Sequence, residues 1–484
     1  MHILMVTSEA APFAKAGGLA DAVSALSKAL RRLGHDVRII MPRYSFISTE
    51  EFALQPFGLF VPMGEATEKA LVYKTLLPDS DTTVYLLDHE GFFGRSGIYG
   101  SKDEPDYADN AKRFAFLSRA AFRLCDNLRW KPDIIHAHDW PSSLCTVYKR
   151  YSEPGYLGSR TILSIHNLGY QGVYSKDFYT YFGLPWELFH GAGLEYYDSI
   201  NLLKGGITSA DSLSTVSPTY AREIQSPELG NSLDGLLRAR SASLVGILNG
   251  IDTDVWNPKT DSYLPSTYHI DDMSGKAVCK EVLQQEFGLA VEPDTPLIAM
   301  VSRLTNQKGV KELFKPGYGT VPDLCKDMDM QMVVLGSGDS WCEKELESLS
   351  SALPNFKARL GYSEKLAHLI EAGADFFLMP SQYEPCGLNQ MYSLRYGTLP
   401  IARRTGGLAD TISNFNEKTG AGTGFLFDAL TPRAIYDTCG WAIWAYYNRT
   451  EQLRAMRRRG MSQDFSWSAS ALEYDALYRS CLGI

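Results

Sequence analysis

The sequence predicts an α/β protein made of two doubly wound domains. Short apolar runs rich in β-branched residues alternate with stretches of helical periodicity along most of the 484-residue chain. This pattern is typical of parallel strands that helices cover on both faces. The chain is also longer than one ordinary hydrophobic core requires. The alternation stops at residues 249–266, where Asn, Asp, Pro and Ser gather without periodicity, so we expect a domain boundary there.

The first domain is expected to span residues 1–255. A helix should follow its first strand, because apolar residues recur at helical spacing from Leu19 to Leu33 and Gly34 then ends the pattern. The glycine pair Gly17–Gly18 therefore lies at the start of this helix. The strands of this domain are predicted at residues 2–8, 36–42, 83–88, 133–138, 160–167, 212–217 and 244–250.

The second domain is expected to span residues 256–463. The last segment, residues 464–484, has a short helical pattern and can pack back on the first domain. Ligands of open α/β sheets bind beyond the carboxyl ends of the strands. The expected site is therefore a deep cleft across which the two domains face each other. The strands of the second domain are predicted at residues 297–303, 331–338, 356–361, 375–381, 399–404 and 424–428.

The composition is that of an ordinary globular chain and argues against several classes of function. The formal net charge is −9, which disfavours a general nucleic-acid binder. No run approaches the ~20 apolar residues of a membrane span. Glu9 interrupts the first apolar run, so we expect no signal peptide, no membrane association and a cytoplasmic location. The eight cysteines form no CxxC pair, which predicts free thiols.

Polar residues suited to a phosphorylated donor gather beyond the predicted strand ends. Arg303 and Lys308 follow one strand and would suit a diphosphate leaving group. Glu384 follows another strand, where it can accept sugar hydroxyls or stabilise positive charge. Each also has an ordinary interpretation, a solvated loop for the cations and a helix N-cap for Glu384. The full set comes from both halves of the chain and predicts transfer from a phosphate-activated donor: Lys15, Asp139, His166, Arg303, Lys308 and Glu384.

The string GGLAD occurs twice, each time between a predicted strand and a predicted helix. Glycine lets a ligand approach the backbone, and a helix start offers N–H groups to an anion. Neither copy is a P-loop or a G-x-G-x-x-G motif, and a simple tight turn is the alternative. We expect the first copy to touch the donor and the second to close the sugar pocket through its backbone; the residues are Lys15, Gly17 and Gly18, then Gly406 and Gly407.

The segment MPSQYEPCGLNQ is expected to add backbone contacts. The amides of Gly387, Leu388 and Asn389 can face a phosphate at the start of the next helix. Cys386 is interpreted as a small packed residue, since no histidine lies near it in sequence. Tyr362 ends another predicted strand, where its ring can stack on a base.

We expect no metal site. We place His136 and His138 of the H-A-H string on opposite faces of their strand, which argues against a shared ion. The D-x-D string at Asp327 and Asp329 would suit a metal-dependent sugar transferase, but it precedes a strand instead of following one. It is therefore interpreted as a solvated loop.

The strings KAGGLAD, HAHDW, HNLGYQG, VSPTYAREI, SRLTNQKG, EPCGLNQ, YGTLPIARRTGGLADTI and DFSW occur in order from residue 1 to about 470. Together they resemble the landmarks of bacterial glycogen synthases and plant starch synthases, glycosyltransferase family five. The resemblance implies a GT-B fold of two Rossmann-like domains, the first on the acceptor side and the second binding a nucleotide sugar. It also implies transfer of glucose from ADP-glucose, with retention, to the non-reducing end of an α-1,4-glucan such as glycogen or a maltooligosaccharide. No metal or other cofactor is implied.

The resemblance also implies roles for individual residues. Glu384 would bind the donor glucose. His166 and Asp139 would lie by the reacting carbon and the acceptor, and Arg303 with Lys308 would hold the diphosphate. The remaining donor contacts would be Lys15, Gly17, Gly18, Asn249, Tyr362, Cys386, Gly387, Leu388, Asn389, Gly406 and Gly407.

Two positions depart from related patterns, and three alternatives stay open. Tyr392 stands where other GT-B families carry a second glutamate, which is usual for this branch, and Ala16 replaces a threonine that many members have. The alternatives are the same fold using UDP-glucose, a two-lobed sugar-binding protein without catalysis, and a dinucleotide oxidoreductase. The missing G-x-G-x-x-G motif disfavours the oxidoreductase.

Overall fold

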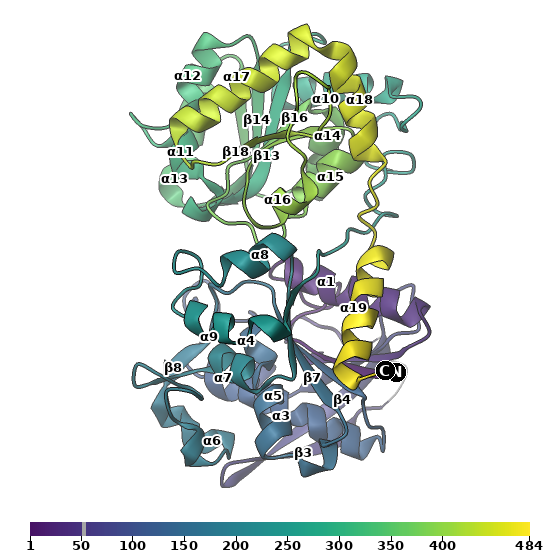
Figure 1. The fold of residues 1–484 in the computed structure, drawn as a ribbon, viewed down its shortest axis with the longest axis vertical. Coiled ribbons are helices and arrows are strands. Elements are labelled where there is room, and N and C mark those ends of the chain that lie inside the picture. Colours follow the sequence, from purple (N-terminus) through teal and green to yellow (C-terminus); the bar gives the residue numbers. More distant parts are fainter. Residues whose placement is uncertain (51–54) are drawn as a thin grey trace. The chain divides into compact units, whose positions relative to one another are not determined.

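The structure is a computed structural model that describes residues 1–50 and 55–484. It divides into two α/β units (Figure 1). The first unit comprises Met1–Gly250 together with Trp467–Ile484, and the second comprises Ile251–Ser466.

The two unit boundaries lie at residues 250 and 466, where the sequence suggested 255 and 463. The amide of Ile251 donates a hydrogen bond of 2.8 Å to the carbonyl of Phe465. This bond joins the first and last segments of the second unit to each other. The chain then returns to the first unit as the final helix, α19 (Trp467–Leu482).

Within the described residues, the first unit is built on a nine-stranded sheet of order β12-β11-β7-β6-β1-β2-β5-β4-β3. Neighbouring strands run parallel from β12 to β5, whereas β3 and β4 form an antiparallel hairpin at the edge. The strands are β1 (His2–Val6), β2 (Asp36–Pro42), β3 (Phe57–Met63), β4 (Ala66–Leu76), β5 (Thr83–Asp88), β6 (Ile134–His138), β7 (Arg160–Ile165), β11 (Ser212–Thr215) and β12 (Leu244–Gly246).

Helices cover this sheet, and α1 shows why they form. Its apolar residues lie on one buried face, Gly17 is its N-cap, and Arg31 and Arg32 lie in its last turn, where cations favour the helix dipole. The longer helices are α1 (Gly18–Arg32), α3 (Asn110–Asn127), α5 (Leu144–Tyr151), α7 (Leu202–Ser209) and α19. The shorter ones are α2 (Glu90–Phe93), α4 (Asp139–Ser142), α6 (Tyr179–Phe182), α8 (Pro218–Glu223) and α9 (Asp234–Ala239).

Helix α19 lies beside α1 (Figure 1). The Asp475 carboxylate lies 2.8 Å from His35 Nε2, and the Ser470 hydroxyl donates to the carbonyl of Leu248 at 2.7 Å. These polar contacts, together with the buried ring of Tyr478, explain why the end of the chain belongs to the first unit.

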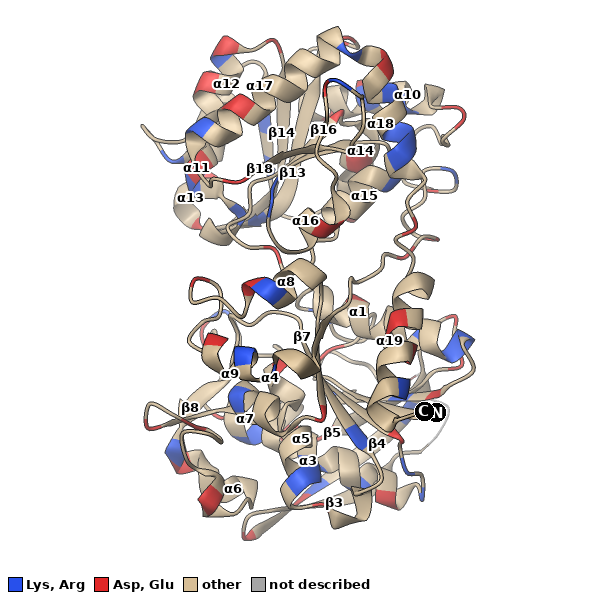
Figure 2. Ribbon diagram, viewed as in Figure 1, with Lys and Arg blue, Asp and Glu red and all other residues tan. Residues whose placement is uncertain are grey.

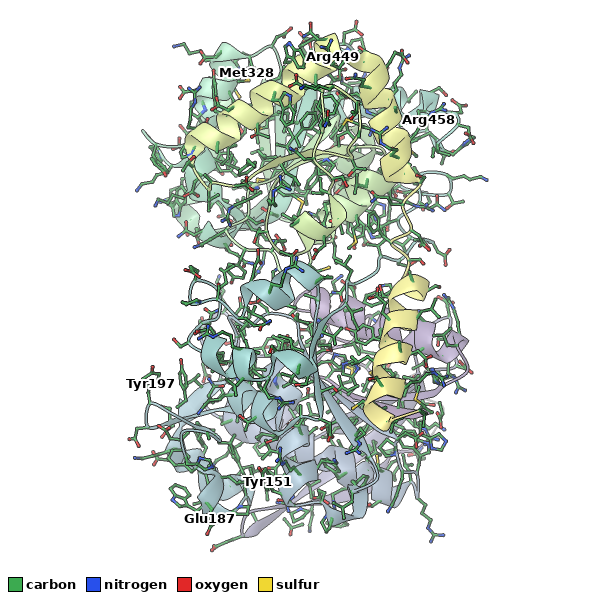
Figure 3. All side chains as sticks on the ribbon, viewed as in Figure 1. Tyr151, Glu187, Tyr197, Met328, Arg449 and Arg458 are labelled. Carbon is green, nitrogen blue, oxygen red and sulfur yellow. The ribbon has the colours of Figure 1, made fainter. Side chains whose placement is uncertain are left out.

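A second, small antiparallel sheet in the first unit comprises β8 (Val173–Ser175), β10 (Ser199–Asn201) and β9 (Glu195–Tyr196). The turn between β9 and β10 has left-handed backbone at Tyr197 (φ 51°) and Asp198 (φ 62°), the geometry of a two-residue hairpin loop. The Tyr197 ring is 82% exposed and projects from the edge of the unit (Figure 3).

Within the described residues, the second unit is a six-stranded, fully parallel sheet of order β15-β14-β13-β16-β17-β18. A buried apolar cluster lies on each face of it, as parallel sheets require. The strands are β13 (Leu297–Leu304), β14 (Gln331–Gly338), β15 (Phe356–Leu360), β16 (Phe376–Met379), β17 (Leu399–Arg403) and β18 (Phe425–Phe427). The helices are α10 (Ser274–Phe287), α11 (Val310–Phe314), α12 (Val321–Asp327), α13 (Ser340–Ala352), α14 (Glu364–Gly373), α15 (Asn389–Arg395), α16 (Gly406–Thr411), α17 (Pro432–Asn448) and α18 (Thr450–Met461).

Figure 2 shows Lys and Arg interspersed with Asp and Glu on each unit in this view. The order of elements confirms the predicted α/β class with two Rossmann-like units. Among the described residues, no helix has both the length and the apolar character needed to cross a membrane.

Candidate active site

The loop between β1 and α1 is held by a buried carboxylate. Glu9 accepts hydrogen bonds from the amides of Ala16 and Gly17, the latter at 3.2 Å, and from the Tyr99 hydroxyl at 2.8 Å. Burial raises the pKa of the Glu9 carboxyl, against the opposing effect of these bonds. Sequence reasoning treated Glu9 only as an interruption of an apolar run. A buried acid at the end of the first strand was the signal that could have found it.

The first GGLAD copy faces open space. A Cβ atom added to Gly17 or Gly18 would meet no other atom within 4 Å. Lys15 is exposed and lies 2.7 Å from the Asp21 carboxylate, which belongs to the same string. The glycines and Lys15 are therefore accessible, as contact with a donor would require.

Asp139 and His166 lie together, at the ends of β6 and β7. The Asp139 carboxylate accepts a hydrogen bond of 2.7 Å from the His166 amide. Asp139 has left-handed backbone (φ 55°), a conformation that few non-glycine residues adopt and in which Asp and Asn are enriched. Burial raises the pKa of Asp139 to about 7 and lowers the pKa of His166 to about 4. At neutral pH the imidazole is therefore uncharged.

The prediction that His136 and His138 point to opposite faces of their strand was wrong. Residues two apart in a strand share a face, and the centroids of the two rings lie 4.1 Å apart. His138 Nδ1 also lies 3.1 Å from His166 Nε2. Even so, no group of three or more His, Cys, Asp or Glu residues in the described part of the chain could hold a metal ion.

In the second unit, Glu384 is the centre of a polar cluster. Lys308 Nζ lies 2.6 Å from Glu384 Oε2, and the Ser381 hydroxyl donates to the same oxygen at 2.8 Å. Glu384 is 6% exposed. It caps no helix: the N-cap of α15 is Leu388, so the alternative interpretation of Glu384 as a helix cap was wrong.

Arg303 is the penultimate residue of β13, and its side chain is exposed. Among the described residues it has no acidic partner, unlike Lys308. An exposed guanidinium without a carboxylate partner, placed at a strand end, is suited to an anionic ligand. The sequence predicted Arg303 at the end of a strand over residues 297–303, and the structure extends that strand by one residue, to Leu304.

The second GGLAD copy packs against the loop that carries Glu384. The Gly407 amide donates to the Glu384 carbonyl at 3.1 Å. A Cβ atom on Gly406 would lie 1.8 Å from that carbonyl, and one on Gly407 would lie 1.9 Å from the Cys386 carbonyl. These glycines let α16 approach the loop closely, and their contact with a sugar stays a prediction.

The loop itself is shaped by Gly387, whose φ of +70° favours glycine. Asn389 at the start of α15 donates its side-chain amide to the Val301 carbonyl at 2.8 Å, which ties the helix to β13. The Cys386 side chain is buried, as expected of a small packed residue. Whether the amides of Gly387, Leu388 and Asn389 meet a phosphate stays a prediction.

Asn249 and Tyr362, the two remaining predicted donor contacts, lie outside the clusters described above. Asn249 is 9% exposed, and its Oδ1 has no hydrogen-bond partner in the part of the chain that the structure describes. Tyr362 is 74% exposed and lines a cavity of about 560 Å³ in the second unit with Tyr263 and Leu360. Among the described residues, Glu384 does not line that cavity.

These features define a class of protein. Two Rossmann-like units, with exposed cations and buried carboxylates at their strand ends, are the arrangement of a GT-B glycosyltransferase. Residues 2–239 match the family model described as the starch synthase catalytic domain, and residues 283–445 match glycosyl transferases group 1. The chain belongs to the family of glycogen and starch synthases and is a glycosyltransferase.

Individual glycogen and starch synthases are similar to this chain along its whole length. The glycogen synthase of Treponema denticola is 52% identical, over 100% of this chain and 99% of its own. Glycogen synthase 1 of Geobacter metallireducens is 46% identical, over 100% and 96%. The catalytic domain of starch synthase IV from Arabidopsis thaliana, solved bound to ADP and acarbose, has a TM-score of 0.88 at 33% identity, covering 100% of this chain and 99% of that one.

Proposed function

We propose that this enzyme transfers glucose from ADP-glucose to the 4-hydroxyl at the non-reducing end of an α-1,4-glucan, with retention, and so extends glycogen. The observation that carries the proposal is the Lys308–Glu384–Ser381 cluster, in the same unit as the exposed Arg303 at the end of β13. A buried carboxylate and two cations suit a reaction in which a sugar carbon gains positive charge while a diphosphate leaves.

The leaving group is the first part of the proposed mechanism. The bond between the anomeric carbon and the diphosphate breaks, and its electron pair goes to ADP. Arg303 and Lys308 stabilise the negative charge that develops there. Two cations can do this without a metal, so we propose that the enzyme needs neither a metal ion nor another cofactor.

The sugar and the acceptor are the second part. Glu384 binds hydroxyls of the donor glucose through its carboxylate. The acceptor oxygen bonds to the anomeric carbon on the face that the diphosphate leaves, and a departing phosphate oxygen takes the acceptor proton, which gives retention. In this proposal Asp139 and His166 lie near the reacting carbon and the acceptor, and the Lys15–Gly18 loop contacts the donor.

Adenine is the proposed base, with Tyr362 as its stacking partner. The structure of starch synthase IV from Arabidopsis thaliana, solved bound to ADP and acarbose, supports the proposed donor and acceptor classes. The same fold using UDP-glucose is the nearest alternative, and a sugar-binding protein without catalysis is a more distant one.

One assay separates these possibilities. The purified chain is incubated with glycogen and either ADP-glucose or UDP-glucose, and both nucleotide release and polymer growth are measured. The proposal predicts ADP release matched by polymer growth, and much slower turnover of UDP-glucose. Faster turnover of UDP-glucose would establish the other donor, and no turnover of either would contradict an active glucosyltransferase.

A further inference from the structure

Two histidines of the first unit, His138 and His166, lie side by side; His138 is buried and His166 is partly buried. His138 Nδ1 lies 3.1 Å from His166 Nε2, and His138 is 1% exposed. Burial holds the pKa of His138 well below its ordinary value and lowers that of His166 to about 4. Both rings are therefore neutral at pH 7, and each has one N–H donor and one acceptor nitrogen.

The second ring nitrogen of His138 faces a group that can only accept. His138 Nε2 lies 3.4 Å from the sulfur of Met5, which lies on the adjacent strand β1. A thioether sulfur has no hydrogen to donate. The favourable arrangement therefore has the hydrogen on His138 Nε2 and the lone pair on His138 Nδ1.

The tautomer of His138 determines which ring nitrogen of His166 carries the hydrogen. Because His138 Nδ1 accepts, His166 Nε2 must be the donor in the contact between the two rings. In a neutral ring the remaining nitrogen, His166 Nδ1, then carries a lone pair. The reverse arrangement would direct the lone pair of His138 Nε2 at the lone pairs of the sulfur, without a hydrogen between them.

The position of the His166 ring is also fixed from the other side. Its backbone amide donates to the Asp139 carboxylate at 2.7 Å. Among the described residues, His166 Nδ1 has no hydrogen-bond partner. In this tautomer His166 Nδ1 is an acceptor that is available to a ligand. The residue is held through its backbone amide by Asp139 and through its ring by His138.

We propose that Met5 and His138 are positioning residues that hold His166 in its Nε2–H tautomer, so that His166 Nδ1 accepts a hydrogen bond from a hydroxyl of the bound sugar. The identity of the ligand as a sugar rests on the proposed function. The tautomer itself rests only on the contacts of the first unit.

His136 shows that this constraint is specific. Its Nε2 lies 2.6 Å from the Ser164 hydroxyl and its Nδ1 lies 2.8 Å from the Tyr478 hydroxyl. A hydroxyl can donate or accept. Both tautomers of His136 are therefore satisfied, whereas the thioether beside His138 admits only one.

The proposal restricts what His166 can do. With its hydrogen directed at His138, the ring offers no proton to the leaving group and acts toward the sugar as an acceptor. This agrees with a mechanism in which phosphate takes the acceptor proton. The proposal also makes the tautomer of His166 depend on Met5, whose sulfur contacts His138.

The first test reads the tautomer directly in the full chain. Histidine labelled with ¹⁵N is incorporated, ring C–H to N correlations are recorded at pH 7 without substrate, and loss of signals in His166→Asn assigns the His166 ring. The expected pattern is pyrrole-type Nε2 and pyridine-type Nδ1. A pyrrole-type Nδ1, or a protonated ring, would overturn the proposal.

A matched pair of variants tests the role of the sulfur. Met5→Leu removes the acceptor, and Met41→Leu changes another buried methionine of the same sheet that contacts no ring nitrogen among the described residues. We expect Met5→Leu to populate both tautomers of His166 and to lower kcat/KM by about 3- to 10-fold, a loss of roughly one hydrogen bond. Met41→Leu should keep the wild-type spectrum. An unchanged His166 tautomer in Met5→Leu would contradict the role of Met5.

Titration with ADP-glucose, without glucan, tests the acceptor role. Binding is followed by calorimetry and the His166 signals by NMR. The proposal predicts that Nδ1 shifts on binding while Nε2 stays pyrrole-type. Binding heat without an Nδ1 shift would overturn the acceptor role, whereas absence of binding heat would instead contradict the proposed donor.

Discussion

Lys308 Nζ lies 2.6 Å from Glu384 Oε2, and the two side chains form an ion pair in the candidate site. Both side chains are largely withdrawn from solvent, at 19% and 8% exposure. The Ser381 hydroxyl bonds to the same oxygen. The pair therefore holds the carboxylate in place and keeps a cation beside it.

This pair predicts different effects for the two cations. Lys308→Gln leaves a buried carboxylate without its cation, so we expect a loss of about 2–4 kcal/mol in unfolding free energy and a fall in kcat of about 100-fold or more. Arg303→Gln should lower kcat similarly but leave thermal unfolding unchanged, since Arg303 is exposed and has no acidic partner in the described chain. Equal destabilisation in both variants would contradict this distinction.

The two GGLAD copies predict opposite outcomes for one substitution. Gly407→Ala places a Cβ atom 1.9 Å from the Cys386 carbonyl, so the loop must move. We expect a loss of about 3 kcal/mol or more in stability. Gly18→Ala meets nothing within 4 Å and should unfold like the wild type. Urea unfolding of both variants checks this, and similar midpoints would show that the packing of the second copy is not as described.

Glu9 predicts an effect on donor affinity. Glu9→Gln removes a charged acceptor from the amides of the Lys15–Gly18 loop, so the KM for the donor should rise by about 10-fold, as expected for a charge-assisted hydrogen bond. Tyr99→Phe removes one donor to Glu9 but keeps the loop bonds, and its KM should change by less than about 3-fold. Steady-state kinetics compare them. An unchanged KM in Glu9→Gln would exclude this role.

Asp139 predicts a pH dependence of stability. Its pKa is raised to about 7 in the folded protein, above that of an unfolded aspartate. The folded state therefore binds the proton more tightly, and the contribution of Asp139 to stability falls as pH rises from about 4 to about 7. Asp139→Asn can still accept the His166 amide bond but cannot ionise. We expect it to be more stable than wild type by about 1–3 kcal/mol above pH 8 and to differ little near pH 4. Thermal unfolding across this range checks the sign, and a constant difference would contradict it.

Chelation tests the proposal that no metal takes part. Dialysis against EDTA should leave kcat within experimental error, because Arg303 and Lys308 neutralise the diphosphate in the proposed mechanism. Loss of activity on chelation, with recovery on adding Mg²⁺ or Mn²⁺, would show that the cations are insufficient.

Much of the fold could be predicted because a parallel strand buried on both faces is a nearly continuous apolar run in the sequence. The predicted strands at 36–42, 83–88 and 331–338 have the same bounds in the structure. The edge hairpin of β3 and β4 was not predicted. β4 alternates buried and exposed residues with an incomplete pattern, and β3 contains Pro62, which argues against a strand in a sequence pattern.

The site could be predicted less completely, since strand ends indicate where residues lie but not what they contact. The proximity of Asp139 to His166 was expected, and its basis is a backbone amide. The shared face of His136 and His138 was missed through a wrong strand periodicity. The position of Glu9 after the first strand could be seen in the sequence, but its bonds to the amides of Ala16 and Gly17 depend on a chain reversal that the local pattern does not show.

We predict that Glu384 of the second unit is essential for the transfer of glucose from ADP-glucose to the end of a glucan chain. The most direct measurement is the incorporation of radiolabelled glucose from ADP-glucose into glycogen by the wild type and by Glu384→Gln, followed by digestion from the non-reducing ends with an enzyme specific for α-1,4 bonds. We predict label released as maltose for the wild type. In Glu384→Gln, incorporation should fall by about 100- to 1,000-fold or more, in a variant that still unfolds cooperatively although the loss of its ion pair with Lys308 lowers its stability. Wild-type incorporation by Glu384→Gln would contradict it.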